Sequence, residues 1–591
     1  MDWQGYFVLG LTVVALLTLM FSRLAPHLVM AGVLVLLSLT GILDAKEALA
    51  GFSNAGLITV AAMLVVAGGL SASGGVDWLV HKVLGNPKHL RGALGRIFPP
   101  VLVLSAFLNN TPVVATFIPA IHAWSRKIGL APSKLMIPLS YSAILGGTLT
   151  LIGTSTNLIV NGQYQSLTGE EGFHLFSITL VGLPVAVIGI AFMWLFFPRW
   201  LPNRKDDTPF ENMREFTLEV AVAHDGPLVG KSIREAGLRE LQRVFLVEIE
   251  RNGHLLMAVA PEEHLQGGDR LVFAGDTEAI SELLRINGIV ASADNQCAEH
   301  LAQPRDGRRL VEVVVSPHCS AIGQTIRDAR FRNRYGAIVL AVARGAERVK
   351  GNLGSIKLEA GDTLLLEARP AFVSRQRYNK DFLLVNDLDV EPPRHRKALL
   401  AWAILVGVVG AAGLGFISML NAALMGAGLM LLTGCMSVGQ AEKSLDLPLI
   451  ITIASSFALG TALQVTGVAG AIAHQLVALS GGHPWLLLIL VYVAVSLLTE
   501  VITNNAAALL MLPIVLEITT KAGLDSTPFV FALMMAASAS FATPLGYQTN
   551  LMVFGPGGYR FNDFLKVGVP MNILVGAATI AVLLIGWPLQ P

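Results

Sequence analysis

Charged residues are scarce in this sequence of 591 residues. Asp, Glu, Lys and Arg make up only 14% of it, whereas roughly a quarter is usual for a soluble protein. Hydrophobic residues make up 53%, and runs such as 175–197 and 567–587 are long enough to cross a bilayer as helices. The net charge of +1 gives no reason to expect a nucleic-acid partner. The composition therefore predicts an α-helical polytopic membrane protein that is embedded in the lipid bilayer.

Cysteine is also rare, and the patterns that mark many enzymes are missing. The three cysteines, Cys297, Cys319 and Cys435, have no spacing typical of a disulfide framework or a metal site, so we expect free apolar thiols. No metal-ligand cluster and no nucleophile–base pair is evident, which argues against an enzyme. The first apolar segment lacks a basic flank and a cleavage site, so it is expected to be a retained span and not a signal peptide.

A charged segment divides the chain into two apolar halves. Residues 1–200 and 396–591 are expected to be membrane repeats. The segment between them is expected to form two α+β domains, at 207–292 and 305–390.

The two apolar halves resemble each other at a nearly constant offset. "GTSTNLIV" (153–160) recurs as "GYQTNLMV" (546–553), and "LITV" (57–60) recurs as "IITI" (450–453), in both cases 393 residues later. The distribution of basic loop residues places about five crossings in each half and the charged segment in the cytoplasm. An odd number of crossings makes the repeats inverted, an arrangement typical of secondary transporters of the cell membrane.

Adjacent amide and hydroxyl residues interrupt two apolar segments, 99–121 and 485–519. These residues are Asn109, Asn110 and Thr111 in the first segment and Thr503, Asn504 and Asn505 in the second. Basic residues flank both ends of the first segment, which predicts a re-entrant hairpin with the polar residues at its tip, and the second is expected to enter from the opposite side. Unpaired backbone at this depth is tolerated only at a protein-lined or water-lined site. Its oxygens can coordinate a monovalent cation, and its N–H groups can hold an anion.

Glycine and hydroxyl residues also break two later spans, at 146–160 and 538–555. Each broken helix is expected to face the hairpin tip of its own repeat, with an anion site between the two halves. In the alternative interpretation, these polar residues only bridge neighbouring helices. Glu500 is an acidic residue beside the second tip, which suits either a functional role or a structural hydrogen bond.

With these motifs, the chain resembles the divalent anion/sodium symporter family, and "GTLTLIGTSTNL" is similar to its sulfate-type branch. The resemblance implies two sodium sites, formed by Ser105, Asn109, Asn110 and Gly153, and by Thr499, Thr503, Asn504 and Gly546. It implies substrate contacts at the two tips and after the two glycines: Asn109, Asn110, Thr111, Thr154, Ser155, Thr156, Thr503, Asn504, Asn505, Tyr547, Gln548 and Thr549. The chain departs from the family pattern where asparagine replaces serine at 109 and threonine at 505.

The charged insert carries a repeat of its own. Residues 216–284 and 310–375 share a strand, a turn, a Gly-[Lys/Gln]-[Ser/Thr]-Ile helix start and a Gly-Asp hairpin into a last strand. This pattern resembles tandem TrkA C-terminal (RCK-C) domains, which commonly dimerise. The insert is expected either to pack and dimerise only or to sense a small ligand as well.

Together, the residues and the resemblance predict a sodium-coupled symporter that imports sulfate or a similar divalent anion. The resemblance adds a homodimer and an elevator motion, with Na⁺ as the coupling ion. A carrier of dicarboxylates or other oxyanions on the same scaffold is one alternative. A ligand-gated sensor or channel, controlled by the insert, is another.

Overall fold

The computed structural model forms two compact units. Residues 1–205, 392–554 and 559–591 make up the first, and residues 206–391 with 555–558 make up the second. The structure describes residues 2–21, 24–76, 79, 83–85, 87, 89–204, 217–238, 241, 244–251, 254–257, 262–275, 286–291, 309–317, 319–344, 347–349, 353–368, 372, 376, 381–387, 397–500, 502–544 and 546–590.

The described residues of the first unit form helices and the connections between them. Its first half contains α1 (Trp3–Phe21), α2 (Pro26–Leu39), α3 (Ala45–Leu49), α4 (Ala55–Ala72), α6 (Leu90–Phe107), α7 (Asn110–Ile128), α8 (Met136–Gly147), α9 (Ser155–Thr168) and α10 (Thr179–Trp200). Its second half contains α14 (Ala398–Gly413), α15 (Met419–Leu432), α16 (Val438–Ser444), α17 (Leu447–Val465), α18 (Val468–Leu479), α19 (Pro484–Thr499), α20 (Asn504–Ala522), α21 (Ser526–Ser538), α22 (Gln548–Phe554) and α23 (Phe561–Gly586).

Helix α10 shows why this unit belongs in a bilayer. It buries Val181 and Val185 completely, yet Leu180 and Val187 on its other face are 67% and 61% exposed. A helix that is apolar on its exposed face as well as its buried face is typical of a membrane span. Six helices of the described residues are long and apolar enough to cross a membrane. The expectation of a polytopic membrane protein is confirmed.

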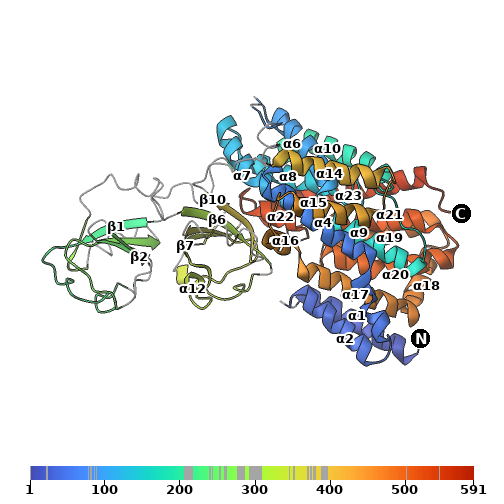
Figure 1. Cartoon of the computed structure of the whole chain (residues 1–591), viewed down its shortest axis with the longest axis horizontal. Helices are drawn as coiled ribbons and strands as arrows, with labels where there is room; N and C mark the ends of the chain where they lie inside the picture. The colour runs from blue at the N-terminus through green and yellow to red at the C-terminus, as the bar shows by residue number, and fades with distance from the viewer. Residues whose placement is uncertain are drawn as a thin grey trace. The chain divides into compact units, whose positions relative to one another are not determined.

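The helices of the two halves interleave, as Figure 1 shows for α4 and α15. Helix α4 packs against α15, α2 packs against α17, and α10 packs against α23. Helices also correspond along the sequence, because α7 begins at Asn110 and α20 begins 394 residues later at Asn504. Under this correspondence, the α4–α15 contact and the α17–α2 contact are the same contact made twice.

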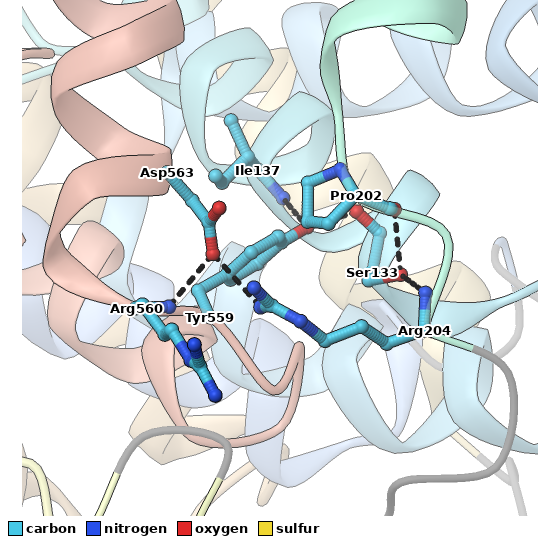
Figure 2. Close-up of polar contacts among 7 residues, drawn as sticks. All are labelled: Ser133, Ile137, Pro202, Arg204, Tyr559, Arg560 and Asp563. Atoms are coloured by element: carbon cyan, nitrogen blue, oxygen red, sulfur yellow. Dashed lines mark hydrogen bonds and ion pairs between the residues drawn. The ribbon is translucent and has the colours of Figure 1, made fainter.

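Figure 2 shows a polar cluster that fixes the segment after α10 to the start of α23. The buried Tyr559 hydroxyl donates to the Ser133 carbonyl oxygen at 2.6 Å and accepts from the Ile137 N–H at 3.0 Å. The Arg204 Nη1 lies 2.8 Å from the Asp563 Oδ2, and the Arg204 N–H donates to the Ser133 Oγ at 3.0 Å. The chain is therefore anchored to the helical unit up to Arg204, one residue before the first unit ends.

The described residues of the second unit form two antiparallel sheets of five strands each (Figure 1). The first has the order β3-β2-β4-β1-β5 and contains β1 (Thr217–Val222), β2 (Val244–Arg251), β3 (His254–Met257), β4 (Arg270–Gly275) and β5 (Ile289–Ala291). The second has the order β10-β6-β9-β7-β8 and contains β6 (Arg309–Val315), β7 (Ala337–Arg344), β8 (Glu347–Arg348), β9 (Thr363–Ala368) and β10 (Phe382–Asp387). When the second order is read from β8 to β10, each of its strands corresponds to a strand of the first order. The two sheets therefore have the same topology.

An ion pair to a buried aspartate recurs in both sheets 93 residues apart. Arg251 donates from Nε and Nη2 to the two carboxylate oxygens of Asp269, at 2.9 and 2.8 Å. Arg344 makes the same pair of bonds to Asp362, at 2.8 and 3.0 Å. A bidentate pair of this kind demands one geometry from both partners. The recurrence therefore shows two copies of one domain.

Two expectations for the insert need correction. The segment after Gly230 forms turns over 233–238 and no helix there, and in the second copy the helix α12 (Phe331–Tyr335) begins six residues after Thr325. The strand after the Gly-Asp hairpin is not the last, because β5 pairs with β1 and β10 pairs with β6. These closing strands escaped the sequence analysis because they lack a shared motif.

The two copies differ at one strained backbone position, which generates a prediction. Arg330 has φ 45° and occupies the place of Gly237, which has φ 70°. A left-handed residue with a side chain costs roughly 1–2 kcal/mol. Because the Arg330 side chain is exposed, Arg330→Gly should stabilise the second copy by about 1 kcal/mol. Hydrogen exchange of β7 and β9 in the full-length protein should slow.

The reciprocal substitution, at the equivalent position of the first copy, provides the control. A side chain at Gly237 would meet no atom within 4 Å, so Gly237→Arg should introduce strain alone and speed exchange in β1 and β4. Faster exchange in Arg330→Gly would contradict the assignment of strain to this position.

Candidate functional site

Two pairs of helices stop and restart at the predicted polar tips. Helix α6 ends at Phe107 and α7 begins at Asn110, whereas α19 ends at Thr499 and α20 begins at Asn504. The helices extend over 90–128 and 484–522, beyond the hairpin bounds expected from the sequence. Asn110, Thr111, Asn504 and Asn505 therefore lie in the first turns of helices, and only Asn109 and Thr503 lie in the breaks.

Two further helices are broken as predicted, and the same bonds hold both breaks. The described residues between α8 and α9 and between α21 and α22 are not helical. Asn157 Nδ2 donates to the Thr150 carbonyl oxygen at 3.0 Å, and Asn550 Nδ2 donates to that of Thr543 at 3.1 Å. The side chains of these two threonines in turn accept from the backbone N–H groups of Gly153 and Gly546. Both breaks are thus closed by a threonine and an asparagine seven residues apart.

A bond at each tip recurs as well. Ser105 Oγ donates to Asn110 Oδ1 at 2.9 Å, and Thr499 Oγ1 donates to Asn504 Oδ1 at 3.1 Å. All four residues belong to the two sodium sites that the family resemblance implies. Each bond spans the helix break and fixes the amide of the central asparagine.

The two glycines of the breaks face clusters of oxygen atoms. A Cβ atom at Gly153 would lie 2.6–3.0 Å from the carbonyl oxygens of Gly147, Ser105 and Ala106. A Cβ atom at Gly546 would lie within 3.0 Å of Ser540 Oγ, Glu500 Oε2 and Thr543 Oγ1. We call these the first and second oxygen cradles. Each combines its broken helix with the tip of the same half, as predicted.

Side chains that follow the two glycines in the sequence form hydrogen bonds with the other half. Thr111 Oγ1 donates to Gln548 Oε1 at 3.1 Å. Thr156 Oγ1 donates to Asn505 Oδ1 at 2.8 Å, and Ser155 Oγ donates to the same atom at 3.4 Å. Each tip is therefore connected to the broken helix of the opposite half, which the sequence analysis did not predict.

Tyr547 lies at the centre of these crossings. Its hydroxyl accepts from Asn110 Nδ2 at 2.6 Å, lies 3.5 Å from Thr154 Oγ1 and also interacts with the Asn504 side chain. Asn110 and Thr154 are buried, and Tyr547 is only 9% exposed. Thr154 and Tyr547 are separated by 393 residues, so they occupy equivalent positions in the two halves. A single hydroxyl thus joins both tips to both broken helices.

Three predicted site residues take no part in the hydrogen bonds that connect the tips to the broken helices. Asn109 and Thr503 form no side-chain hydrogen bond within the described part of the chain. Thr549 Oγ1 lies 2.8 Å from Ser140 Oγ of α8 and so contacts the buried core. Ser140 Oγ also lies 2.7 Å from Asn550 Oδ1, which can accept the single Ser140 hydroxyl proton.

Several residues that shape the site were not predicted from the sequence: Thr150, Thr543, Ser540, Asn157, Asn550 and Asn572. A threonine three residues before each glycine, at the common offset of 393, was the available signal for Thr150 and Thr543. Asn572 lies in α23, far along the chain from either motif, and no repeat points to it.

The hydrogen bonds between the tips and the broken helices bring the N-termini of four helices together. The contacts above join the first turn of α7 to that of α22, and the first turn of α9 to that of α20. None of the side chains in these contacts is basic. Helix N-termini present unpaired N–H groups and a partial positive charge, which favour an anion. The arrangement can therefore hold an anion without Lys or Arg.

A family model and individual known proteins that are similar to this chain describe transporters. The family model for the citrate transporter (CitMHS) matches residues 16–477 and 417–589. A Chlamydomonas reinhardtii protein named "Putative sulfur deprivation response regulator" is 36% identical over 93% of this chain and 96% of its own length. An uncharacterized transporter of Synechocystis sp. is 33% identical over 100% of this chain and 98% of its own length. Sodium/sulfate cotransporter 1 of Chlamydomonas reinhardtii is 26% identical over 97% and 89%.

The central position of Tyr547 generates a prediction. Tyr547→Phe removes the acceptor of the Asn110 amide, and leaving a buried donor unpaired costs about 1–3 kcal/mol. Hydrogen exchange should therefore become faster in the first turn of α7 and in α22. Tyr6→Phe is the matched control, because Tyr6 is 65% exposed and its substitution should leave exchange unchanged. Unaltered exchange in Tyr547→Phe would show that this hydroxyl does not hold the helices together.

Proposed function

Because the chain belongs to the citrate transporter (CitMHS) family, we propose that it is a sodium-coupled symporter that imports sulfate or a similar divalent anion. The family and the similarity to sodium/sulfate cotransporters identify it as an anion transporter and not an enzyme. Sulfate is proposed as the substrate because several relatives carry that substrate in their names. The sulfate-type "GTLTLIGTSTNL" motif supports the same choice.

The convergence of the four helix N-termini carries this proposal. A divalent oxyanion needs several N–H or O–H donors arranged around it. The first turns of α7, α9, α20 and α22 supply backbone N–H groups, and Thr111, Ser155 and Gln548 supply partly or fully exposed side chains beside them. Such broken helices form the substrate sites of many secondary transporters. We therefore propose the substrate contacts that the family resemblance implies, with Thr549 in a supporting position.

The two oxygen cradles support a role for sodium. Unwound backbone carbonyls and hydroxyl groups are the donors that coordinate Na⁺ in broken-helix transporters. The first cradle offers three carbonyl oxygens and the second offers a carboxylate and two hydroxyl oxygens. Each lies beside a proposed anion contact, so a bound cation would favour binding of the anion electrostatically. This proximity gives a physical basis for coupling.

The architecture of the proposed carrier follows from its internal repeat. Contacts between helices occur in related pairs, such as α4–α15 with α17–α2 and α6–α8 with α19–α21. This pairing supports a twofold relation between the halves, and an odd number of crossings in each half makes the repeats inverted. The two tips are then re-entrant hairpins. An elevator motion and a homodimer follow from the family resemblance.

The second unit is proposed to be a pair of cytoplasmic RCK-C domains. The duplicated sheet and the repeated Arg–Asp pair support a tandem arrangement of this kind. A ligand-gated sensor is the second candidate function, and the relative named for a sulfur deprivation response supports it. Uptake by the purified protein distinguishes a carrier from a sensor, which would bind the anion without moving it.

Sodium-driven uptake is the first prediction of this proposal. In proteoliposomes, labelled sulfate should accumulate under an inward sodium gradient and should not accumulate when a proton gradient replaces it. An excess of unlabelled dicarboxylate, citrate or phosphate should compete poorly. Strong competition by a carboxylate would identify the substrate as an organic anion. Undiminished uptake at zero sodium would overturn sodium coupling.

The central asparagines provide the second prediction. Each amide offers one acceptor oxygen and two N–H donors, and its loss leaves partners unpaired at a cost of about 1–3 kcal/mol. Asn110→Ala and Asn504→Ala should therefore weaken substrate or sodium affinity roughly five- to hundredfold, with expression intact. Asn109→Ser and Asn505→Thr restore the family pattern and serve as milder controls. Normal transport by both alanine variants at low sodium and low sulfate would place the site elsewhere.

A further inference from the structure

The two oxygen cradles differ in charge at one pair of equivalent positions. Ala106 contributes a backbone carbonyl to the first cradle, and Glu500, 394 residues later, contributes a carboxylate oxygen to the second. Gly147 and Ser540 form a second equivalent pair at an offset of 393, and here a hydroxyl replaces a carbonyl oxygen. The first cradle is therefore neutral, whereas the second has an acidic side chain.

The hydrogen bonds of Glu500 leave one oxygen available. Its Oε1 accepts from Asn572 Nδ2 at 2.8 Å and from the Ala542 N–H at 3.3 Å. Among the described residues, its Oε2 accepts one hydrogen bond, from Thr543 Oγ1 at 3.0 Å. A carboxylate oxygen can accept two such bonds. The open position belongs to Oε2, the oxygen that faces Gly546.

A hydroxyl group without a hydrogen-bond partner also lies beside Gly546. The Ser540 Oγ has no hydrogen-bond partner, and Ser540 is 0% exposed. It is the atom nearest to the position that a Cβ of Gly546 would take. Within the described residues, no Lys, Arg or His forms an ion pair with Glu500. A partly buried carboxylate without a counter-charge and an unpaired buried hydroxyl together favour a cation.

We infer that Glu500 is a direct ligand of the cation in the second cradle, together with Ser540 and Thr543. This inference rests on the proposed sodium coupling and makes the two cation sites unequal. A formal negative charge strengthens attraction to a monovalent cation far more than a carbonyl dipole does. The second cradle therefore binds sodium more tightly and fills before the first.

Sodium binding to purified protein in detergent tests the inference independently of transport. Thermal unfolding is recorded against sodium chloride concentration, with choline chloride to hold ionic strength constant. The parent protein should show a high-affinity and a low-affinity phase of stabilisation. Glu500→Gln keeps the size and hydrogen-bonding capacity of the side chain, and it should weaken the high-affinity phase at least tenfold. Glu517→Gln, a carboxylate of α20 beside Lys521 and outside the cradle, should leave both phases unchanged.

Ser540→Ala provides a second variant should Glu500→Gln lose monodispersity. It removes only the unpartnered hydroxyl and should weaken the same phase several-fold. A parent protein that responds to sodium, with Glu500→Gln identical to it, overturns this inference and leaves the proposed function standing. A parent protein without any sodium response overturns sodium coupling and this inference together.

Discussion

The site depends on how two helices can stop in the interior of the protein. Every residue of α8 is buried, and α21 is buried from Pro528 to its end. The breaks that follow these helices contain backbone carbonyl groups without helical partners, at a depth where water does not replace the missing donors. The amides of Asn157 and Asn550 donate to the carbonyl oxygens of Thr150 and Thr543 within the two breaks. Only because these carbonyls are satisfied can the following glycines approach the tips and the next helices begin beside them.

Much of this arrangement was predictable from the sequence, because an internal repeat assigns every motif a counterpart. The membrane class, the broken helices and the polar tips all followed from apolar runs interrupted at matching positions. The bonds that cross between the halves did not. An offset identifies which residues are equivalent, but it does not reveal that Asn110 contacts Tyr547 and not Thr154. That choice depends on the packing of α7 against α22, which no local pattern encodes.

The insert was likewise predictable only in part from its sequence. Its two copies share hydrophobic spacing and a Gly-Asp turn, so the duplication was predicted. The exchange of a glycine for Arg330 at a left-handed position was invisible, because backbone conformation is not evident from a substitution alone. The closing strands β5 and β10 were missed for a related reason. Their pairing is determined by the edges of sheets formed earlier in the chain.

The contact between Thr154 and Tyr547 has a historical consequence. Under the proposed twofold relation between the halves, equivalent residues touch only where they lie on the axis that relates them. In an ancestor assembled from two identical chains, such a residue would meet its own copy, and any mutation would change both sides at once. Fusion into a single chain removes this restriction. The axis could then carry a phenol on one side and a small hydroxyl on the other, an asymmetric pair that no assembly of identical subunits could contain.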